Sequence, residues 1–199
     1  MHSKEPFAQK NNMKILAILT IFIISSTFVF GELPIGEAPP TIVLEGDLGG
    51  RLDGTPWNSE ELVSGKVIVL FYVDPDESDL NNHVSDALKA ENFPLDKYGS
   101  IGMANMGATW LPNFAINIKL KSKQEKHKST IYVKDLKKTV VNKWGLSDDN
   151  SDVILFGKDG KVLYSFDGKS RVKFTICLTE EDYLCNSNFE YNIDRRRII

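Results

Sequence analysis

Cysteine is scarce in this chain of 199 residues, which contains two, Cys177 and Cys185, eight positions apart. There are three histidines, and no group of cysteines and histidines has the spacing of a zinc site. No G-x-S-x-G nucleophile motif is present, and Gly46–Gly50 lacks the glycine spacing of a dinucleotide fingerprint. We therefore expect no cofactor, metal or catalytic residue. These absences favour a protein that is not an enzyme.

Basic charge is also in deficit, with 24 Lys and Arg against 27 Asp and Glu and a formal net charge of -3. Residues 1–31 carry three lysines and one glutamate, so residues 32–199 carry a net charge of -5. Duplex nucleic acid is bound by basic surfaces that displace its counterions. We expect no nucleic-acid partner for a body this acidic.

One long apolar run is present, ILAILTIFIISSTFVF at residues 15–30, and Lys14 precedes it. A membrane-spanning helix needs about 20 apolar residues, whereas a signal peptide has a shorter run after a basic start. Val29 and Gly31 suit cleavage before Glu32. We predict a signal peptide at residues 1–31, with Met13 as an alternative start, and a periplasmic protein of a Gram-negative bacterium. An uncleaved segment would instead anchor the protein to the inner membrane, facing the periplasm.

The body of the chain alternates between strand and helix patterns. Val67–Val73 is a seven-residue apolar run (VIVLFYV), typical of a central strand covered on both faces. Asp74, Pro75 and Glu77 then form a helix start with a capping box. Further elements are predicted at 41–44 (strand), 58–64 (short helix with an Asn58–Glu61 capping box), 98–105 (strand), 110–128 (helix), 130–133 (strand), 136–144 (helix), and 153–156 with 162–166 (hairpin strands). Residues 110–120 admit two patterns: Leu111, Phe114, Ala115 and Ile118 fit the core face of a helix, whereas Phe114, Ile116, Ile118 and Leu120 fit strand alternation. The lysine-rich continuation through Lys128 favours the helix.

This order predicts an α/β fold for residues 32–169, a thioredoxin-like three-layer sandwich with a mixed central sheet and a terminal β-hairpin. Residues 170–199 have neither a helical stripe nor strand alternation, although they contain both cysteines. We interpret them as an atypical C-terminal tail. A genuine tail and a shifted reading frame near Lys169 both remain open, and resequencing the locus separates them.

Several short motifs carry a family resemblance, namely Thr55–Asn58 with Leu62, Gly65–Val67, the strand–KDG–strand hairpin at 153–162, and Phe166–Gly168. On these residues the chain resembles the YtfJ family of exported bacterial proteins, which implies a thioredoxin-like fold over residues 32–169. Members of that family are often labelled transcriptional regulators. The acidic body and the export signal argue against that role here, so it ranks third among the functions considered.

A thioredoxin-like oxidoreductase has a Cys-x-x-Cys at the start of the helix after its first central strand, where the helix N-terminus stabilises a thiolate. That position is held here by Asp74, Asp76, Glu77 and Ser78. The proline that usually precedes the hairpin strand is also missing, because Asn150–Asp152 stands there. We conclude that this is a degenerate redox site. Its carboxylates are interpreted as helix caps rather than as ligands of a hard cation.

The remaining distinctive residues admit structural interpretations. In an exported chain Cys177 and Cys185 are predicted to form a structural disulfide, and a thiol enzyme that uses them is the second functional hypothesis. The tryptophans are expected in the core, and His83 and His127 on the solvated surface. A basic strip is interpreted as a solvated helix face, with an anionic partner or lipid headgroup as the alternative; it consists of Lys119, Lys121, Lys123, Lys126 and Lys128.

Together these observations favour a non-enzymatic periplasmic binding or interaction module. Its partner would be an unidentified periplasmic protein or small ligand. Membrane contact is expected only through an uncleaved N-terminal segment.

Overall fold

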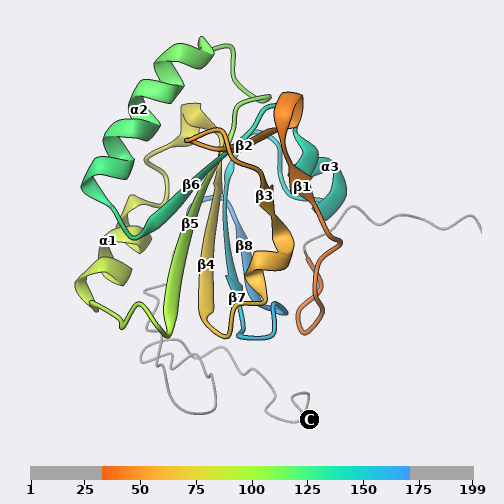
Figure 1. Ribbon diagram of the computed structural model, residues 1–199, viewed down its shortest axis with the longest axis vertical. Coiled ribbons are helices and arrows are strands. Elements are labelled where there is room, and N and C mark those ends of the chain that lie inside the picture. The colour runs from red at the N-terminus through yellow and green to blue at the C-terminus, as the bar shows by residue number, and fades with distance from the viewer. Residues whose placement is uncertain (1–32, 171–199) are drawn as a thin grey trace, which may run out of the picture. The chain divides into compact units, whose positions relative to one another are not determined.

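The computed structural model describes residues 33–170, which fold around a six-stranded sheet (Figure 1). The strand order is β2-β6-β5-β4-β7-β8. The strands are β2 (Gly49–Arg51), β4 (Val67–Val73), β5 (Tyr98–Asn105), β6 (Thr130–Asp135), β7 (Ser151–Phe156) and β8 (Val162–Asp167). A separate two-stranded ladder pairs β1 (Val43–Leu44) with β3 (Trp57–Asn58). The helices are η1 (Gly46–Leu48), η2 (Ser59–Leu62), η3 (Pro75–Glu77), α1 (Asn82–Ala90), α2 (Asn113–Lys126) and α3 (Thr139–Trp144).

The sheet is mixed, as predicted. Strand β4 pairs in parallel with β5, and β5 pairs in parallel with β6. On its other side β4 pairs antiparallel with β7, and β7 and β8 form the predicted terminal hairpin. The uninterrupted apolar run of β4 is explained by this central place, because both of its faces are covered.

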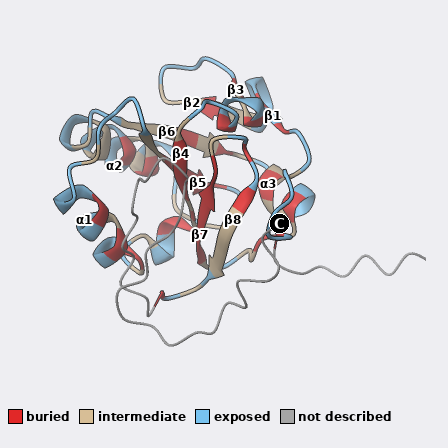
Figure 2. Cartoon of the chain, turned by 90° about the horizontal axis from the view of Figure 1, so that it is seen from below, coloured by how far each residue is buried: buried red, intermediate tan, exposed pale blue. Residues whose placement is uncertain are grey.

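The two faces of the sheet are covered by different elements. One face packs against α3 and the β1–β3 ladder through Val140, Trp144, Leu44 and Trp57. The opposite face packs against α1 through Val84 and Leu88 and against α2 through Ile116 and Leu120. Figure 2 shows the buried strands between these layers. The predicted three-layer, thioredoxin-like α/β sandwich is therefore confirmed.

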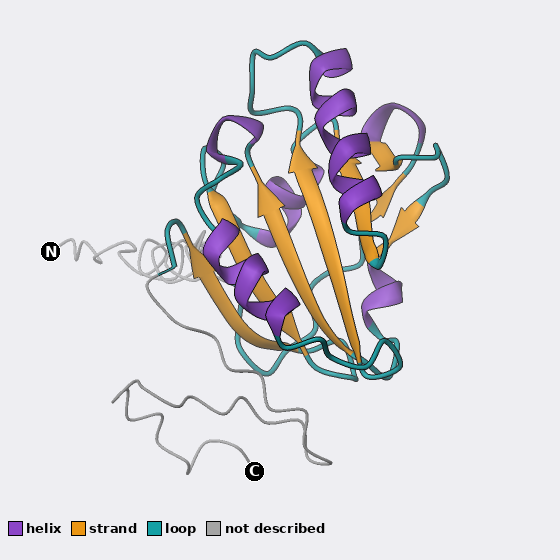
Figure 3. Ribbon diagram, turned by 90° about the vertical axis from the view of Figure 1, so that its left-hand side faces the viewer, coloured by secondary structure: helices purple, strands orange, loops and turns teal. Residues whose placement is uncertain are grey.

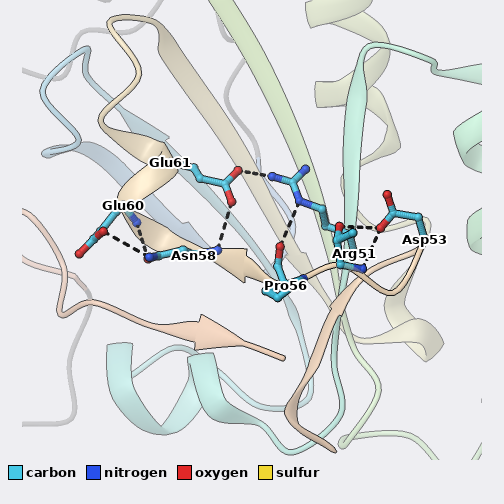
Figure 4. A network of polar contacts seen from close by, with 7 residues as sticks. Arg51, Asp53, Pro56, Asn58, Glu60 and Glu61 are labelled. Carbon is cyan, nitrogen blue, oxygen red and sulfur yellow. Dashed lines mark hydrogen bonds and ion pairs between the residues drawn. The ribbon is translucent and has the colours of Figure 1, made fainter. Parts of the chain in front are cut away.

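The segment around Asn58 forms the predicted capping box. The Asn58 side chain accepts a hydrogen bond from the Glu60 backbone N–H, and the Asn58 backbone N–H donates to the Glu61 carboxylate (Figure 4). Glu61 also forms an ion pair with Arg51 on β2. This contact joins η2 to the edge strand β2 of the sheet.

Three details of the fold differ from the sequence-based expectation. The helix expected directly after Asp74 is a short 3-10 turn, η3, and α1 begins only at Asn82. Strand β2 was not predicted, because it is built from Gly49, Gly50 and Arg51 and exists only through its pairing with β6. Gly49 has φ 131°, and a Cβ there would lie 1.9 Å from the Lys134 carbonyl oxygen, so only glycine fits.

The third difference concerns side-chain burial along α2. The helix itself was predicted, but Phe114 and Ile118, assigned to its core face, are exposed, whereas Ile116 and Leu120 are buried. Trp110, also expected in the core, is 85% exposed, in contrast to Trp57 and Trp144, which are buried as predicted. The apolar positions of this segment fit two opposite faces of a helix, so periodicity alone did not identify the inner one.

Some predictions concern residues outside the described range. These are the signal peptide at residues 1–31 and the tail that carries Cys177 and Cys185. Within residues 33–170, no helix has the length and apolar character needed to cross a bilayer.

Candidate functional site

The position of a thioredoxin-type redox site lies where β4 ends. Asp74 follows β4, and its backbone N–H donates to the Asn150 carbonyl oxygen at 2.9 Å, just before β7. The two segments that would form a dithiol site therefore do lie side by side. They carry Asp74 and Asn150 at this contact, and residues 33–170 contain no cysteine.

Asp74 acts as the predicted cap. It is buried, and its Oδ1 accepts a hydrogen bond from the Asp76 backbone N–H at 2.9 Å. Burial nevertheless raises the pKa of Asp74, and the nearby charge of Asp76 adds to this effect. The expected stabilisation of an anion at this helix start is thus outweighed by desolvation.

The other residues predicted at this site, Asp76, Glu77 and Ser78, are consecutive but have different surroundings. Asp76 is exposed, and its Oδ2 accepts a hydrogen bond from the Thr109 hydroxyl at 2.8 Å. Glu77 is exposed, and Ser78 lies at one end of a groove between two helices. In the described part of the chain, no three His, Cys, Asp or Glu side chains are grouped so that they could hold a metal ion.

The groove itself is the second candidate site. It has a volume of about 740 Å³ and lies between α1 and α2, with the sheet as its floor. Figure 3 shows the two helices in front of the sheet, with strands between them. Its apolar lining comes from both the sheet and the helices and includes Phe71, Val73, Tyr98, Ala104, Ile116, Leu120 and Tyr132.

The groove exists because β5 presents small side chains on this face. Ser100, Gly102 and Ala104 alternate along β5, and Gly102 lies between Phe71 of β4 and Tyr132 of β6 in the strand register. A Cβ at Gly102 would lie 2.8 Å from the Tyr132 ring. The Tyr132 ring therefore lies over Gly102, and the small side chains of β5 leave both Phe71 and Tyr132 only half-buried in the middle of the sheet.

The polar lining of the groove is strongly basic. Among residues 33–170, five lysines and one glutamate line it, whereas the same range as a whole has 16 basic and 20 acidic residues. Burial lowers the pKa of His127, and the charges of Lys89 on α1 and Lys123 on α2 lower it further, against a weaker opposing effect of Asp86. Lysines from both helices therefore converge near His127, where an anion would be stabilised.

Sequence reasoning missed this groove, and its prediction for His127 is wrong, whereas Lys119, Lys126 and Lys128 are exposed, as predicted for the lysine strip. His127, expected on the solvated surface, is half-buried in the groove wall. Four of the five lysines in the predicted solvated strip line the groove, and Lys121 does not. The small residues at 100, 102 and 104 were the available signal. Because they share one face of a buried strand, they predict a depression on that face of the sheet.

The mixed sheet with helices on both faces defines a protein of the thioredoxin-like fold class. Residues 46–179 match the family model described as "Bacterial protein of unknown function (YtfJ_HI0045)", and the chain belongs to this family. The resemblance identified in the sequence is thereby confirmed.

Relatives in this family share the chain over most of its length. An uncharacterized protein of Haemophilus influenzae is 30% identical over 165 residues, which cover 78% of this chain and 89% of that protein. The uncharacterized protein YtfJ of Escherichia coli K12 is 28% identical over 116 residues, or 56% of this chain and 62% of that protein. Among solved structures, the exposed lipoprotein thioredoxin of Streptococcus pneumoniae TIGR4 aligns with 66% of this chain and 92% of its own, at 15% identity and a TM-score of 0.48.

Proposed function

We propose that this protein is a non-enzymatic binding module that works in the periplasm and holds a small amphipathic ligand in the groove between α1 and α2. The ligand would have an apolar body and an acidic end group. The observation that carries the proposal is the groove, which combines an apolar floor with a basic wall in an otherwise acidic domain.

The size and lining of the groove support a small-molecule ligand. Ligand sites are typically of about 300–1,000 Å³, mostly apolar, with a few polar groups that fix orientation. The groove of about 740 Å³ lies within that range. Half-buried aromatic side chains on its floor, such as Phe71 and Tyr132, would lose water contact when an apolar chain covers them.

The charge of the groove supports an acidic end group. Lys89 of α1, Lys123 of α2 and His127 after α2 all line the groove. A carboxylate or phosphate there would offset the mutual repulsion of the lysines, and charge-assisted hydrogen bonds would fix its place. Of the residues at the former redox position, Ser78 lines the groove, whereas Asp74, Asp76 and Glu77 do not.

The proposal is tested with a fluorescent fatty acid, 11-(dansylamino)undecanoic acid, and its methyl ester. The acid should bind with enhanced, blue-shifted emission, and the ester should bind about tenfold more weakly, because it lacks the charge that the lysines attract. Equal affinity for both probes would contradict the acidic end group. No saturable binding of either would contradict the groove as a ligand site.

Filling part of the groove should weaken binding without unfolding the protein. Ser100→Leu places a larger side chain above β5, so we expect the affinity for the dansyl probe to fall at least about tenfold while the thermal midpoint shifts by only a few degrees. The measurement is a fluorescence titration paired with a circular dichroism melt. Unchanged affinity in a folded Ser100→Leu protein would place the ligand elsewhere.

The contribution of charge is tested separately by Lys89→Glu with Lys123→Glu. This double variant should weaken binding of the acid and leave binding of the ester nearly unchanged. The matched control is Lys137→Glu with Lys143→Glu, two exposed lysines that do not line the groove. Because both doubles change the net charge equally, a similar loss in the control would mean that only overall charge matters. Cys177→Ser with Cys185→Ser should bind normally, and loss of binding there would favour the thiol hypothesis.

A further inference from the structure

Helix α2 carries apolar residues on two opposite sides. Ile116 and Leu120 are buried against the sheet, whereas Phe114 and Ile118 are 68% and 65% exposed. Successive residues of a helix are rotated by about 100°, so positions two apart, such as 116 and 118, lie on nearly opposite sides. The second apolar side therefore faces away from the core.

Trp110 extends this exposed apolar surface. It precedes α2 by three residues and is 85% exposed, the highest value among the large apolar side chains of residues 33–170 that are exposed. Phe114 and Ile118 are four residues apart and so lie one above the other. We call these three residues the outer apolar stripe. None of them lines the groove.

The stripe is accompanied by positive charge. Lys121 lies three residues after Ile118, on the same side of the helix, and Lys119 directly follows Ile118 in sequence. Helix α2 has four lysines and one acidic residue, Glu125, which lies seven residues beyond Ile118. Aromatic and aliphatic side chains beside lysines are the composition of helices that lie in a membrane interface.

We propose that the outer apolar stripe of α2 docks the protein on a lipid bilayer that contains anionic phospholipid. Trp110, Phe114 and Ile118 would enter the headgroup region, and Lys119 and Lys121 would contact lipid phosphates. A second copy of the chain fits this face less well, because two copies of a helix with a net charge of +3 would repel each other.

This inference shares only Lys119 with the lining of the ligand groove and does not depend on the groove. Figure 1 shows α2 at the edge of the molecule, with one side toward the sheet and one side away from it. The groove lies beside the inner side, so a docked helix would bring the groove close to the bilayer. Proteins that exchange an amphipathic ligand with a membrane need such a placement.

Trp110 provides a local probe of docking. The chain has three tryptophans, and the other two, Trp57 and Trp144, are 0% and 3% exposed. Quenching by iodide should therefore report mainly on Trp110. With vesicles of phosphatidylcholine containing 30% phosphatidylglycerol, Trp110 should become protected from iodide and be quenched by brominated lipid. Because this readout is local, binding through any other part of the full chain would not produce it.

The decisive variants are Phe114→Ser with Ile118→Ser, measured in the full chain by vesicle flotation at 50 mM salt. We expect the partition coefficient of this double variant to fall at least about tenfold. Lys121→Glu should lower the partition coefficient about fivefold or more. The matched control, Ile35→Ser with Val63→Ser, removes two apolar side chains that are 61% and 63% exposed and lie outside α2. The control should partition within about twofold of the unchanged protein.

Three results would overturn the docking proposal. The first is that test and control variants float equally well, and the second is that Trp110 stays accessible to iodide on vesicles. The third is a dimer in sedimentation velocity that Phe114→Ser with Ile118→Ser abolishes, which would assign the stripe to self-association. Ser100→Leu should float normally, so a failure of the ligand groove and a failure of membrane docking are told apart.

Discussion

Replacing Asp135 by alanine is expected to lower the free energy of unfolding by about 4 kcal/mol. Asp135 ends β6 and is fully buried. Its carboxylate accepts backbone N–H groups of Lys137, Thr139 and Val140 at 3.2, 2.9 and 2.8 Å, and the Tyr72 hydroxyl donates to it at 3.1 Å. Alanine would leave these donors in the interior without an acceptor, and each buried unsatisfied donor costs about 1–3 kcal/mol.

The loss would remove a large share of a typical total stability of about 5–15 kcal/mol. Urea unfolding followed by circular dichroism measures it. Asp135→Asn keeps one acceptor oxygen, so its free energy of unfolding should lie between those of the unchanged protein and Asp135→Ala. Burial raises the pKa of Tyr72 strongly, and the charge of Asp135 adds to this, so the phenol stays protonated and donates. Tyr72→Phe should therefore cost only about 1 kcal/mol. A loss below 1 kcal/mol for Asp135→Ala would refute this account.

Much of the fold could be predicted because its signals are local. The VIVLFYV run of β4, the Asn58–Glu61 capping box and the hairpin around Gly157–Gly160 each fix an element within a few residues. The order of these elements then leaves few topologies, since parallel neighbours need a crossover helix. For the same reason the residues that follow the central strand β4, beginning with Asp74, could be located from the order of residues along the chain.

The rest depends on contacts between distant segments. Strand β2 is specified by the approach of Gly49 to β6, which leaves no local pattern. The groove needs α1, β5 and α2 at once, and its sequence signal is only the small size of Ser100, Gly102 and Ala104. The inner side of α2 could not be distinguished from the outer side, because both sides are apolar.

Buried carboxylates were missed for a related reason. Asp135 and Asp152 both lie at strand ends, where an aspartate usually signals a solvated turn. Asp152 sits in β7 between Tyr72 of β4 and Asp167 of β8 in the strand register, and it is 2% exposed. In the described part of the chain its Oδ2 has no hydrogen-bond partner. A buried acid in this state favours its neutral form.

Asp152 should therefore make the stability of the protein fall as the pH rises. Burial raises the pKa of Asp152 to about 8, with the charge of Asp167 as the second cause. Because the pKa in the folded state is above that of the unfolded chain, about 3.9, the folded state binds the proton more tightly. Its stabilising effect is complete below about pH 4 and is lost between about pH 4 and pH 8.

Asp152→Asn should remove this dependence, because the amide is a neutral side chain of nearly the same shape. We expect similar stability of variant and unchanged protein near pH 4, and a gain on the order of 5 kcal/mol for the variant at pH 9. Urea unfolding at several pH values measures the difference. Asp96→Asn, at an exposed position, is the matched control and should run parallel to the unchanged protein. If the Asp152→Asn curve also runs parallel from pH 4 to 9, Asp152 is ionised in the folded protein and must have a partner that offsets its burial.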